Sequence, residues 1–229
     1  MSLVMPLYNE ADGIGAIVEA LITTLEREGI PFQLVLVDNG SIDGTALVLE
    51  ALSARHAGLT VATVPVNQGY GWGILSGLDV ATGDIVGFMC ADGQIAAEDI
   101  VRVYRRMILG DVDLAKVVRV SRQDGFQRRL MSAVYNHLFR VLFGLALRDI
   151  NGTPKLVWRK TYSDLTLTSK DWFIDAELMI QAAQRRLRVG EVEANFLARN
   201  HGSSNVRLTT SLEFLANMLR HRLRPRVRR

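Results

Sequence analysis

The stretch "FQLVLVDNGSIDGT", residues 32–45, contains the pattern that decides the fold. An unbroken run of Leu and Val ends in an aspartate, and a loop rich in Gly, Ser and Asp follows it. The amphipathic run "GTALVLEALSARH" (44–56) continues from that loop. A short apolar run bounded by turn residues is typical of a buried strand, and the longer amphipathic run is typical of a helix. The stretch therefore predicts a strand, a polar loop and a helix in succession.

The same alternation recurs on both sides of this unit. Further strands are expected at 3–5, 59–65, 83–89 and 112–118, and further helices at 14–29, 71–81 and 97–110. Strands separated by helices of this length form βαβ units, in which a mainly parallel sheet is covered by helices on both faces. With 229 residues, 48% of them hydrophobic, the chain can bury one substantial core. The prediction is an α/β fold.

The second half of the chain is less regular. Helices are expected at 128–149, whose apolar face is broad, at 175–186 and at 211–223. The last of these leads into "RHRLRPRVRR" (220–229), where six of ten residues are arginine. We expect a single catalytic domain over residues 1–210 and a basic amphipathic helix and tail over 211–229. A core helix followed by a solvated tail is the alternative interpretation.

Charge and cysteine content give no indication of a nucleic-acid partner or of disulfide bonds. The 27 basic and 24 acidic residues nearly balance, and the arginine tail lacks interleaved aromatic residues, so no nucleic-acid partner is expected. One cysteine forms no intramolecular disulfide, which fits a reducing cytosol. The N-terminal residues "MSLVMPLYNE" do not resemble a secretory signal, and no run of about 18 apolar residues predicts a membrane span. We expect a soluble or peripheral protein.

Polar loops follow four of the predicted strands: "PLYNE" (6–10), "DNGSIDGT" (38–45), "NQGYGWG" (67–73) and "CADGQ" (90–94). In parallel sheets, ligands bind beyond the carboxyl ends of the strands, where these loops would meet. The spacing of a dinucleotide-binding fingerprint is absent after the first strand, and no P-loop sequence occurs. The loops therefore predict a site of another kind at this edge.

Taken in order, these four loops resemble those of the family 2 inverting glycosyltransferases of the GT-A fold. The segments "RDINGTPKL" (148–156) and "ARNHGSS" (198–204) resemble the dolichol-phosphate mannose synthase branch of that family. The resemblance implies a Rossmann-like nucleotide-diphospho-sugar transferase fold. It also implies transfer of a hexose, with inversion, from a GDP- or UDP-hexose to a polyprenyl phosphate of the dolichyl or undecaprenyl type. The enzyme would need Mg²⁺ or Mn²⁺ and would act as a peripheral protein at the cytoplasmic face of the membrane.

The resemblance also assigns residues to the donor site. Those implied to bind the nucleotide sugar are Pro6, Tyr8, Glu10, Asp38, Asn39, Asn67, Ala91 and Asp92. Asp92 and Gln94 are the implied metal ligands, because they occupy the end of the family's Asp-x-Asp pattern. A purely structural role is the alternative for two of these loops: "DNGSIDGT" would form a turn with a helix cap, and "NQGYGWG" would form a turn that leads into a helix.

Two positions depart from the family pattern. Cys90 stands where the first aspartate of Asp-x-Asp is usual, and Asn39 stands where a second aspartate is usual after Asp38. Mg²⁺ and Mn²⁺ prefer oxygen ligands to a thiol, so the metal site is expected to be weakened rather than lost. We interpret Cys90 as a small buried side chain at a strand end, because a single displacement needs no nucleophilic cysteine.

Arginines complete the implied machinery. The implied catalytic residues are Asp92, Arg119 and Arg129, and the implied acceptor-phosphate residues are Arg119, Arg129 and Arg199. A phosphate acceptor is already an anion, so arginines that bind it and offset developing charge serve better than an acid–base pair. Solvated surface is the alternative for each arginine.

Two other hypotheses stay open at this point. A family member acting on a neutral glycan or lipid-linked acceptor would need a general base, for which Asp175 and Glu177 are the candidates. We interpret these two residues as structural or capping groups at a helix start. A degenerate member that binds nucleotide or membrane without efficient chemistry is motivated by Cys90 and Asn39.

Overall fold

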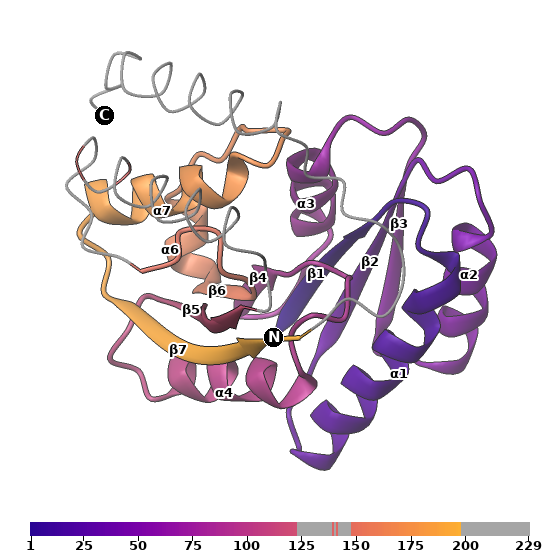
Figure 1. The fold of residues 1–229 in the computed structure, drawn as a ribbon, viewed down its shortest axis with the longest axis horizontal. Helices are drawn as coiled ribbons and strands as arrows, with labels where there is room; N and C mark the ends of the chain where they lie inside the picture. The colour runs from indigo at the N-terminus through magenta and orange to yellow at the C-terminus, as the bar shows by residue number, and fades with distance from the viewer. Residues whose placement is uncertain (123–138, 140, 142–147, 198–229) are drawn as a thin grey trace.

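The computed structural model describes residues 1–122, 139, 141 and 148–197 (Figure 1). Seven strands form one sheet: β1 (Ser2–Leu7), β2 (Gln33–Asn39), β3 (Leu59–Val64), β4 (Ile85–Phe88), β5 (Leu114–Arg122), β6 (Lys155–Trp158) and β7 (Val189–Phe196). The described helices are α1 (Ala11–Arg27), α2 (Thr45–Arg55), α3 (Tyr70–Asp79), α4 (Ala97–Ile108), α6 (Arg159–Ser163) and α7 (Ile174–Gln184).

The strand order across the sheet is β3-β2-β1-β4-β6-β5-β7. The strands β1 to β4 pair in parallel, as do β5 and β7, whereas β6 runs antiparallel to both of its neighbours. Six strands therefore end at one edge of the sheet, and β6 begins there. The prediction of an α/β fold built on a mainly parallel sheet is confirmed.

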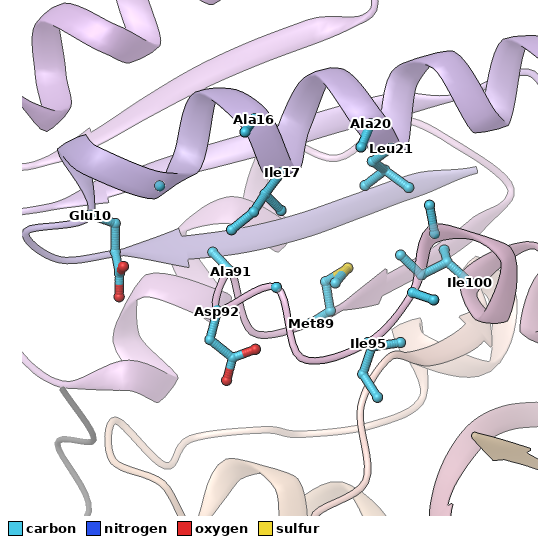
Figure 2. A pocket seen from close by; sticks show the side chains of 14 residues that line it. Glu10, Ala16, Ile17, Ala20, Leu21, Met89, Ala91, Asp92, Ile95 and Ile100 are labelled. Carbon is cyan, nitrogen blue, oxygen red and sulfur yellow. The ribbon is translucent and has the colours of Figure 1, made fainter. Parts of the chain in front are cut away.

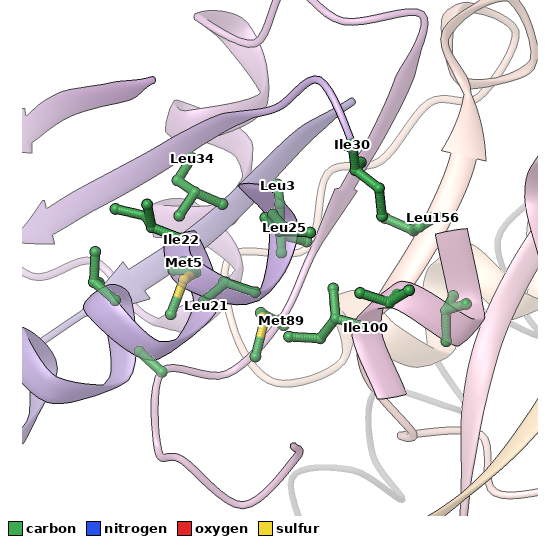
Figure 3. Packing of buried hydrophobic residues seen from close by; sticks show 14 of the residues in the cluster. Leu3, Met5, Leu21, Ile22, Leu25, Ile30, Leu34, Met89, Ile100 and Leu156 are labelled. Carbon is green, nitrogen blue, oxygen red and sulfur yellow. The ribbon is translucent and has the colours of Figure 1, made fainter. Parts of the chain in front are cut away.

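Helices cover both faces of this sheet (Figure 1). Alternate residues of β1 point to opposite sides, so Leu3 and Met5 pack with α1 and α4 on one face and Val4 packs with α3 on the other. Figure 3 shows the first of these clusters, where side chains of α1 such as Leu21 and Leu25 lie between Leu3, Met5 and Ile100. The buried residues of α1 recur at helical spacing, and this pattern allowed the helix to be predicted from the sequence.

Strands β1 to β5 and helices α1 to α4 and α7 lie within a few residues of their predicted positions. The sequence prediction named neither β6 nor β7, nor the short helix α6. Most of the helix expected over 128–149, and all of the helix expected over 211–223, lies outside the described residues. Phe139 and Val141 are helical, but the last two residues of the first range, Arg148 and Asp149, are not. Asp149 has a left-handed backbone conformation (φ 45°), which ends a helix.

The carboxyl edge of the sheet is open between β1 and β4. Pro6 lies near the end of β1, where β4 no longer pairs, because the β1–β4 register stops at Val4 and Phe88. A proline is tolerated there because its missing N–H would have no strand partner on that side. The chains leaving β1 and β4 therefore separate at this point, and the space between them opens toward the loops.

Candidate active site

A pocket of about 270 Å³ lies between α1 and the segment that leaves β4 (Figure 2). Its walls are mostly small and apolar, with Ile17, Met89 and Ile100 among the side chains that line it. Figure 2 shows the carboxylates of Glu10 and Asp92 at one end of the pocket. Loops from two separate strands therefore bring two of the predicted donor-site residues to the same opening.

A tight turn at 92–94 sets the position of the Asp92 carboxylate. Asp92 Oδ1 accepts a hydrogen bond from the backbone N–H of Gln94 (3.1 Å), and Gly93 adopts a left-handed conformation (φ 68°). Gln94 is tied to the end of β7: its carbonyl oxygen accepts the N–H of Leu197 (2.9 Å), and its Nε2 donates to the Leu197 carbonyl oxygen (3.0 Å). Gln94 thus joins the loop of residues 90–94, the predicted metal loop, to the end of β7 at the edge of the sheet.

Cys90 is a half-buried thiol that is held within the fold. Its Sγ lies 3.4 Å from the Tyr70 hydroxyl and 3.9 Å from Thr153 Oγ1. Burial and the neighbouring Asp92 charge raise the pKa of the thiol from 9.0 to about 12. The ring of Tyr70 stacks on Trp172, with centroids 4.2 Å apart, which fixes the direction of its hydroxyl. At neutral pH the residue is a neutral thiol, which is a poor ligand for Mg²⁺ or Mn²⁺.

The loops after β1 and β2 hold one another in place. The Glu10 N–H donates to Thr45 Oγ1 (2.9 Å), and Asn9 Oδ1 accepts the N–H of Ile42 (2.9 Å). Asp38 is 5% exposed, and its Oδ1 accepts the N–H of Ser41 (2.9 Å). Tyr8 is 38% exposed at the start of the same region. These hydrogen bonds hold the loops after β1 and β2 in a fixed arrangement at the edge of the sheet.

The predicted amides Asn39 and Asn67 shape the loop after β3. Asn39 is 3% exposed, and its Nδ2 donates to the carbonyl oxygen of Gly69 (2.9 Å). Asn67 Oδ1 accepts the N–H of Gly69 (2.8 Å). Gly69 itself has φ 110°, and a Cβ there would strike the carbonyl oxygen of Lys170. A glycine is therefore required where this loop meets the segment before α7.

Arg119 lies in β5 and forms a bidentate ion pair with Asp149. Its Nε and Nη2 donate to the two carboxylate oxygens, each at 2.7 Å, and its guanidinium carbon lies 5.1 Å from the centre of the Phe196 ring. Burial opposes the charge, but the hydrogen bonds and charge of Asp149 outweigh it and raise the pKa of Arg119. The partner of Arg119 leads to the Cys90 loop: the Gly152 N–H donates to the Asp149 carbonyl oxygen (2.9 Å), and the Oγ1 of the adjacent Thr153 lies 3.9 Å from Cys90 Sγ.

The two candidate general bases are engaged within the protein. The carboxylate of Glu177 accepts hydrogen bonds from the N–H groups of Thr168 (3.0 Å) and Ser169 (2.8 Å) and from the Thr168 hydroxyl (3.0 Å). Asp175 is buried and paired with Lys155. Burial raises the pKa of Asp175, although Lys155 opposes the shift. These contacts agree with the structural interpretation of both residues.

The structure thus brings most of the predicted site residues to one edge of the sheet. Arg129 and Arg199 lie outside the described residues, so their predicted roles stay predictions. The sequence analysis did not identify Tyr70, Thr153, Lys155 or Asp149 as parts of this edge. Tyr70 and Asp149 fall inside segments that matched the family pattern, but their contacts are with residues 20 and 30 positions away in the sequence.

The described part of the chain offers few metal-ligating side chains at this edge of the sheet. Among the described residues, no group of three or more His, Cys, Asp or Glu side chains could hold an ion. Mg²⁺ is commonly bound through one or two carboxylates, and the phosphates of its substrate complete the coordination. Asp92, with hard oxygen atoms at an open pocket, fits such a shared site, whereas Cys90 does not.

Comparison with known sequences identifies related proteins. The chain is 33% identical over 211 residues to an undecaprenyl-phosphate 4-deoxy-4-formamido-L-arabinose transferase of Pseudomonas fluorescens, a match that covers 89% of this chain and 59% of the relative. A second transferase of that name, from another P. fluorescens strain, is 27% identical over 96% of this chain and 63% of the relative. The chain therefore spans about three-fifths of the length of these curated relatives.

Comparison with solved structures identifies the fold. Glucosyl-3-phosphoglycerate synthase from Mycobacterium tuberculosis, crystallised with Mn²⁺, uridine diphosphate and phosphoglyceric acid, superposes with a TM-score of 0.76 at 21% identity, covering 99% of this chain and 79% of the other. A complex of the same enzyme with Mg²⁺ and uridine diphosphate gives a TM-score of 0.74 at 22% identity, covering 96% and 78%. These likenesses confirm the predicted GT-A fold.

A family model described as "Glycosyl transferase family 2" matches residues 2–166, which include β1 to β6 and the loops at their carboxyl edge. This match covers well over half of the chain, and it includes Glu10, Asp92, Arg119 and Asp149. The resemblance read from the loop sequences is therefore confirmed: the chain belongs to glycosyl transferase family 2.

Proposed function

We propose that this chain is a metal-dependent, inverting glycosyltransferase that moves a sugar from a nucleotide-diphosphate sugar to a polyprenyl phosphate. The observation that carries the proposal is that the loops after β1 and β4 and the Arg119–Asp149 pair of β5 lie at one edge of the sheet. The Glu10 and Asp92 carboxylates lie at one end of one pocket (Figure 2). Arg119 of β5 is paired with Asp149, and the turn that begins at Asp149 places Thr153 Oγ1 3.9 Å from Cys90 Sγ. Such an edge can receive a diphosphate and a second anion side by side.

The comparisons support a uridine nucleotide as the donor. The structurally similar synthase was crystallised with uridine diphosphate and with Mn²⁺ or Mg²⁺, and the curated relatives are named for transfer of a modified arabinose to undecaprenyl phosphate. We therefore propose UDP-sugars first and retain GDP-hexoses as alternatives. Pro6, Tyr8, Glu10, Asp38, Asn39, Asn67 and Ala91 would form the nucleotide-sugar site with Asp92.

Asp92, with Gln94 beside it, would hold the divalent ion. Mg²⁺ or Mn²⁺ bound there would neutralise the negative charge that develops on the departing diphosphate. The turn that fixes Asp92 through the Gln94 N–H keeps the carboxylate in place before substrate arrives. With a thiol at Cys90 the protein offers one fewer carboxylate, and the substrate phosphates would supply further oxygen ligands.

A phosphate acceptor explains why no general base is needed. The phosphate oxygen is already an anion near neutral pH, and it attacks the anomeric carbon while the nucleoside diphosphate leaves from the opposite side. The result is a single displacement with inversion. Arg119 binds and orients the attacking phosphate, together with Arg129 and Arg199. A neutral acceptor would require a base, but Glu177 and Asp175 are engaged in hydrogen bonds and an ion pair.

The lipid acceptor implies that the enzyme works at a membrane surface. We propose that residues 1–210 form the catalytic domain and that the basic, amphipathic segment 211–229 contacts anionic lipid at the cytoplasmic face. Within the described residues, no helix is both long enough and apolar enough to span a bilayer.

The test is a transfer assay with the purified chain, a panel of UDP- and GDP-sugars, Mn²⁺ or Mg²⁺, and geranylgeranyl phosphate in mixed micelles. We expect a glycosyl phosphate lipid and a nucleoside diphosphate in equal amounts, with inverted anomeric configuration by NMR. Geranylgeraniol, which lacks the phosphate, should not react. Absence of product across the whole donor panel would refute the proposal.

Asp92→Asn is the first variant to compare with the wild type. The amide has the same shape but lacks the charge that holds the ion, so we expect activity to fall by on the order of 100-fold and the Mn²⁺ requirement to rise. Asp111→Asn is the matched control, because Asp111 is an exposed carboxylate paired with Arg106 at the opposite edge of the sheet. Equal activity of the two variants would exclude Asp92 as the metal ligand.

A further inference from the structure

Asp149 holds the guanidinium of Arg119 more completely than an ordinary surface ion pair would. Asp149 Oδ2 accepts both the Arg119 backbone N–H (2.9 Å) and its Nε–H (2.7 Å), while Oδ1 accepts from Nη2 (2.7 Å). The side chains are only 14% and 11% exposed. Three hydrogen bonds from one residue to one carboxylate fix both the backbone and the plane of the guanidinium.

This arrangement leaves one edge of the guanidinium for another ligand. Within the described part of the chain, no hydrogen bond engages Nη1 of Arg119. The turn that begins at Asp149 reaches the predicted metal loop, because the Gly152 N–H donates to the Asp149 carbonyl oxygen (2.9 Å) and the Oγ1 of the adjacent Thr153 lies 3.9 Å from Cys90 Sγ. The Nη1 edge is therefore the part of Arg119 that a phosphate could contact without breaking the pair with Asp149.

The turn that contains Asp149 is itself fastened to β5. Lys116 is fully buried, and its Nζ donates to the carbonyl oxygens of Arg148 (2.6 Å) and Asp149 (3.0 Å). Gly152 closes the turn through its N–H to the Asp149 carbonyl oxygen (2.9 Å). A Cβ on Gly152 would strike the Val117 carbonyl oxygen, so the turn lies directly against the strand. The same strand thus carries both Arg119 and the lysine that holds its partner.

We propose that Asp149 is a positioning residue for sugar transfer: it fixes Arg119 so that the Nη1 edge meets the acceptor phosphate, and Lys116 holds Asp149 in place. The inference rests on the proposed function, in which Arg119 binds that phosphate. An arginine in solution samples many rotamers, and ordering it during binding would cost affinity and alignment. Holding it in advance makes the site complementary to the phosphate before the lipid arrives.

Asp149→Asn is the main test, assayed for transfer to geranylgeranyl phosphate. The amide keeps the shape of the side chain but loses the charge and one acceptor. We expect kcat/KM for the acceptor to fall by on the order of 100-fold, with unchanged affinity for the sugar nucleotide by calorimetry. Asp149→Glu keeps the charge but shifts the guanidinium, so it should also lose acceptor efficiency. If both variants retain wild-type kcat/KM, the proposal is wrong.

The Arg119→Ala background separates positioning from a purely structural role. If Asp149 acts through Arg119, Asp149→Asn should cause no further loss of kcat/KM in that background, although the free energy of unfolding decreases. Multiplicative losses would overturn the proposal. Thermal unfolding of each variant shows which ones are folded, and only those that are folded at the assay temperature are compared.

The chain offers a control with the same geometry. Asp113 accepts the Arg188 N–H (2.8 Å), its Nε–H (3.1 Å) and its Nη2–H (3.0 Å), just before β5 begins and far from the carboxyl edge. Asp113→Asn breaks an equivalent three-bond pair, so it should leave transfer unchanged. A loss equal to that of Asp149→Asn would mean that any such pair matters only for folding.

A binding measurement keeps this inference distinct from the proposed function. Geranylgeranyl phosphate is titrated into the protein in the presence of UDP and Mn²⁺. If the wild type transfers no sugar, the proposed reaction fails. Weaker binding of the lipid phosphate by Asp149→Asn than by Asp113→Asn would still support the positioning role, and equal binding by the two variants would overturn it.

Discussion

Replacement of Cys90 by aspartate would restore the usual family residue, yet it is expected to destabilise the metal-free protein. Burial and the Asp92 charge raise the pKa of the thiol from 9.0 to about 12. The same surroundings would oppose any anion at this position. At about 1.36 kcal/mol per pH unit, the difference of about three units corresponds to about 4 kcal/mol against a charged side chain. Cys90→Asn, which has the shape of aspartate without its charge, is the matched comparison.

The pH dependence gives the sign of this effect. An aspartate at position 90 would have its pKa raised in the folded state from about 3.9 to roughly 7. Between these values the folded state binds more protons than the unfolded state, so stability falls as pH rises. We therefore expect Cys90→Asp and Cys90→Asn to be similarly stable below about pH 4. Above about pH 7 they should differ by about 4 kcal/mol, with the aspartate variant the less stable.

Urea unfolding across this pH range, first with a chelator and then with Mn²⁺ and UDP, measures the difference. A bound cation would offset the new charge, so Mn²⁺ with UDP should stabilise Cys90→Asp more than it stabilises Cys90→Asn. If the two variants are equally stable at every pH without metal, the position tolerates an anion. That result would refute the expectation that burial and the Asp92 charge oppose an anion at position 90.

Three further predictions concern the framework of the site. Gly77→Ala should destabilise the protein by about 1–3 kcal/mol in urea unfolding, because the new Cβ strikes Val4 at the α3–β1 contact. In Gly15→Ala of α1 the new Cβ would only reach ordinary contact with Val48 (3.9 Å), so this variant should instead be stabilised by up to about 1 kcal/mol. Equal effects of the two substitutions would contradict the packing argument. Burial and Lys155 lower the pKa of Lys116 from 10.5 to about 8. The unfolded state then binds more protons between these values, so the wild type should gain about 3 kcal/mol relative to Lys116→Met as pH rises through this window. A constant difference in unfolding free energy would rule this out. Glu177→Gln should lower the unfolding free energy by roughly 1–3 kcal/mol but leave kcat with the phosphate acceptor unchanged, whereas a collapse of kcat would identify Glu177 as a base.

Local patterns in the sequence were sufficient to predict the strands and helices of the first half of the fold. The largely apolar runs of β1, β2 and β4 and the helical spacing of α1 and α4 bury their side chains in ways that short segments reveal. Polar loops after those strands predicted one edge of the sheet as the site. Glu10 and Asp92 lie there together because parallel strands end on the same side.

The remaining strands depended on partners far away in the chain. β6 has only four residues, and its antiparallel direction is set by pairing with β4 and β5. β7 buries Gly190, Val192 and Ala194, so its inward face carries little apolar surface for a sequence pattern to detect. Residue type and spacing within a short segment do not predict such pairings, because they form between distant segments when the sheet assembles.

The sequence by itself determined the order of β1 to β5 with the helices between them, the family, and the loops that carry Asp92 and Glu10, because each of these follows from neighbouring residues. Only the tertiary structure decided what the polar groups contact. It placed the Cys90 thiol against Tyr70 and Arg119 against Asp149, across separations of 20 and 30 residues. Protonation and orientation depend on those through-space neighbours, because charge and burial act over distance in space and not along the chain.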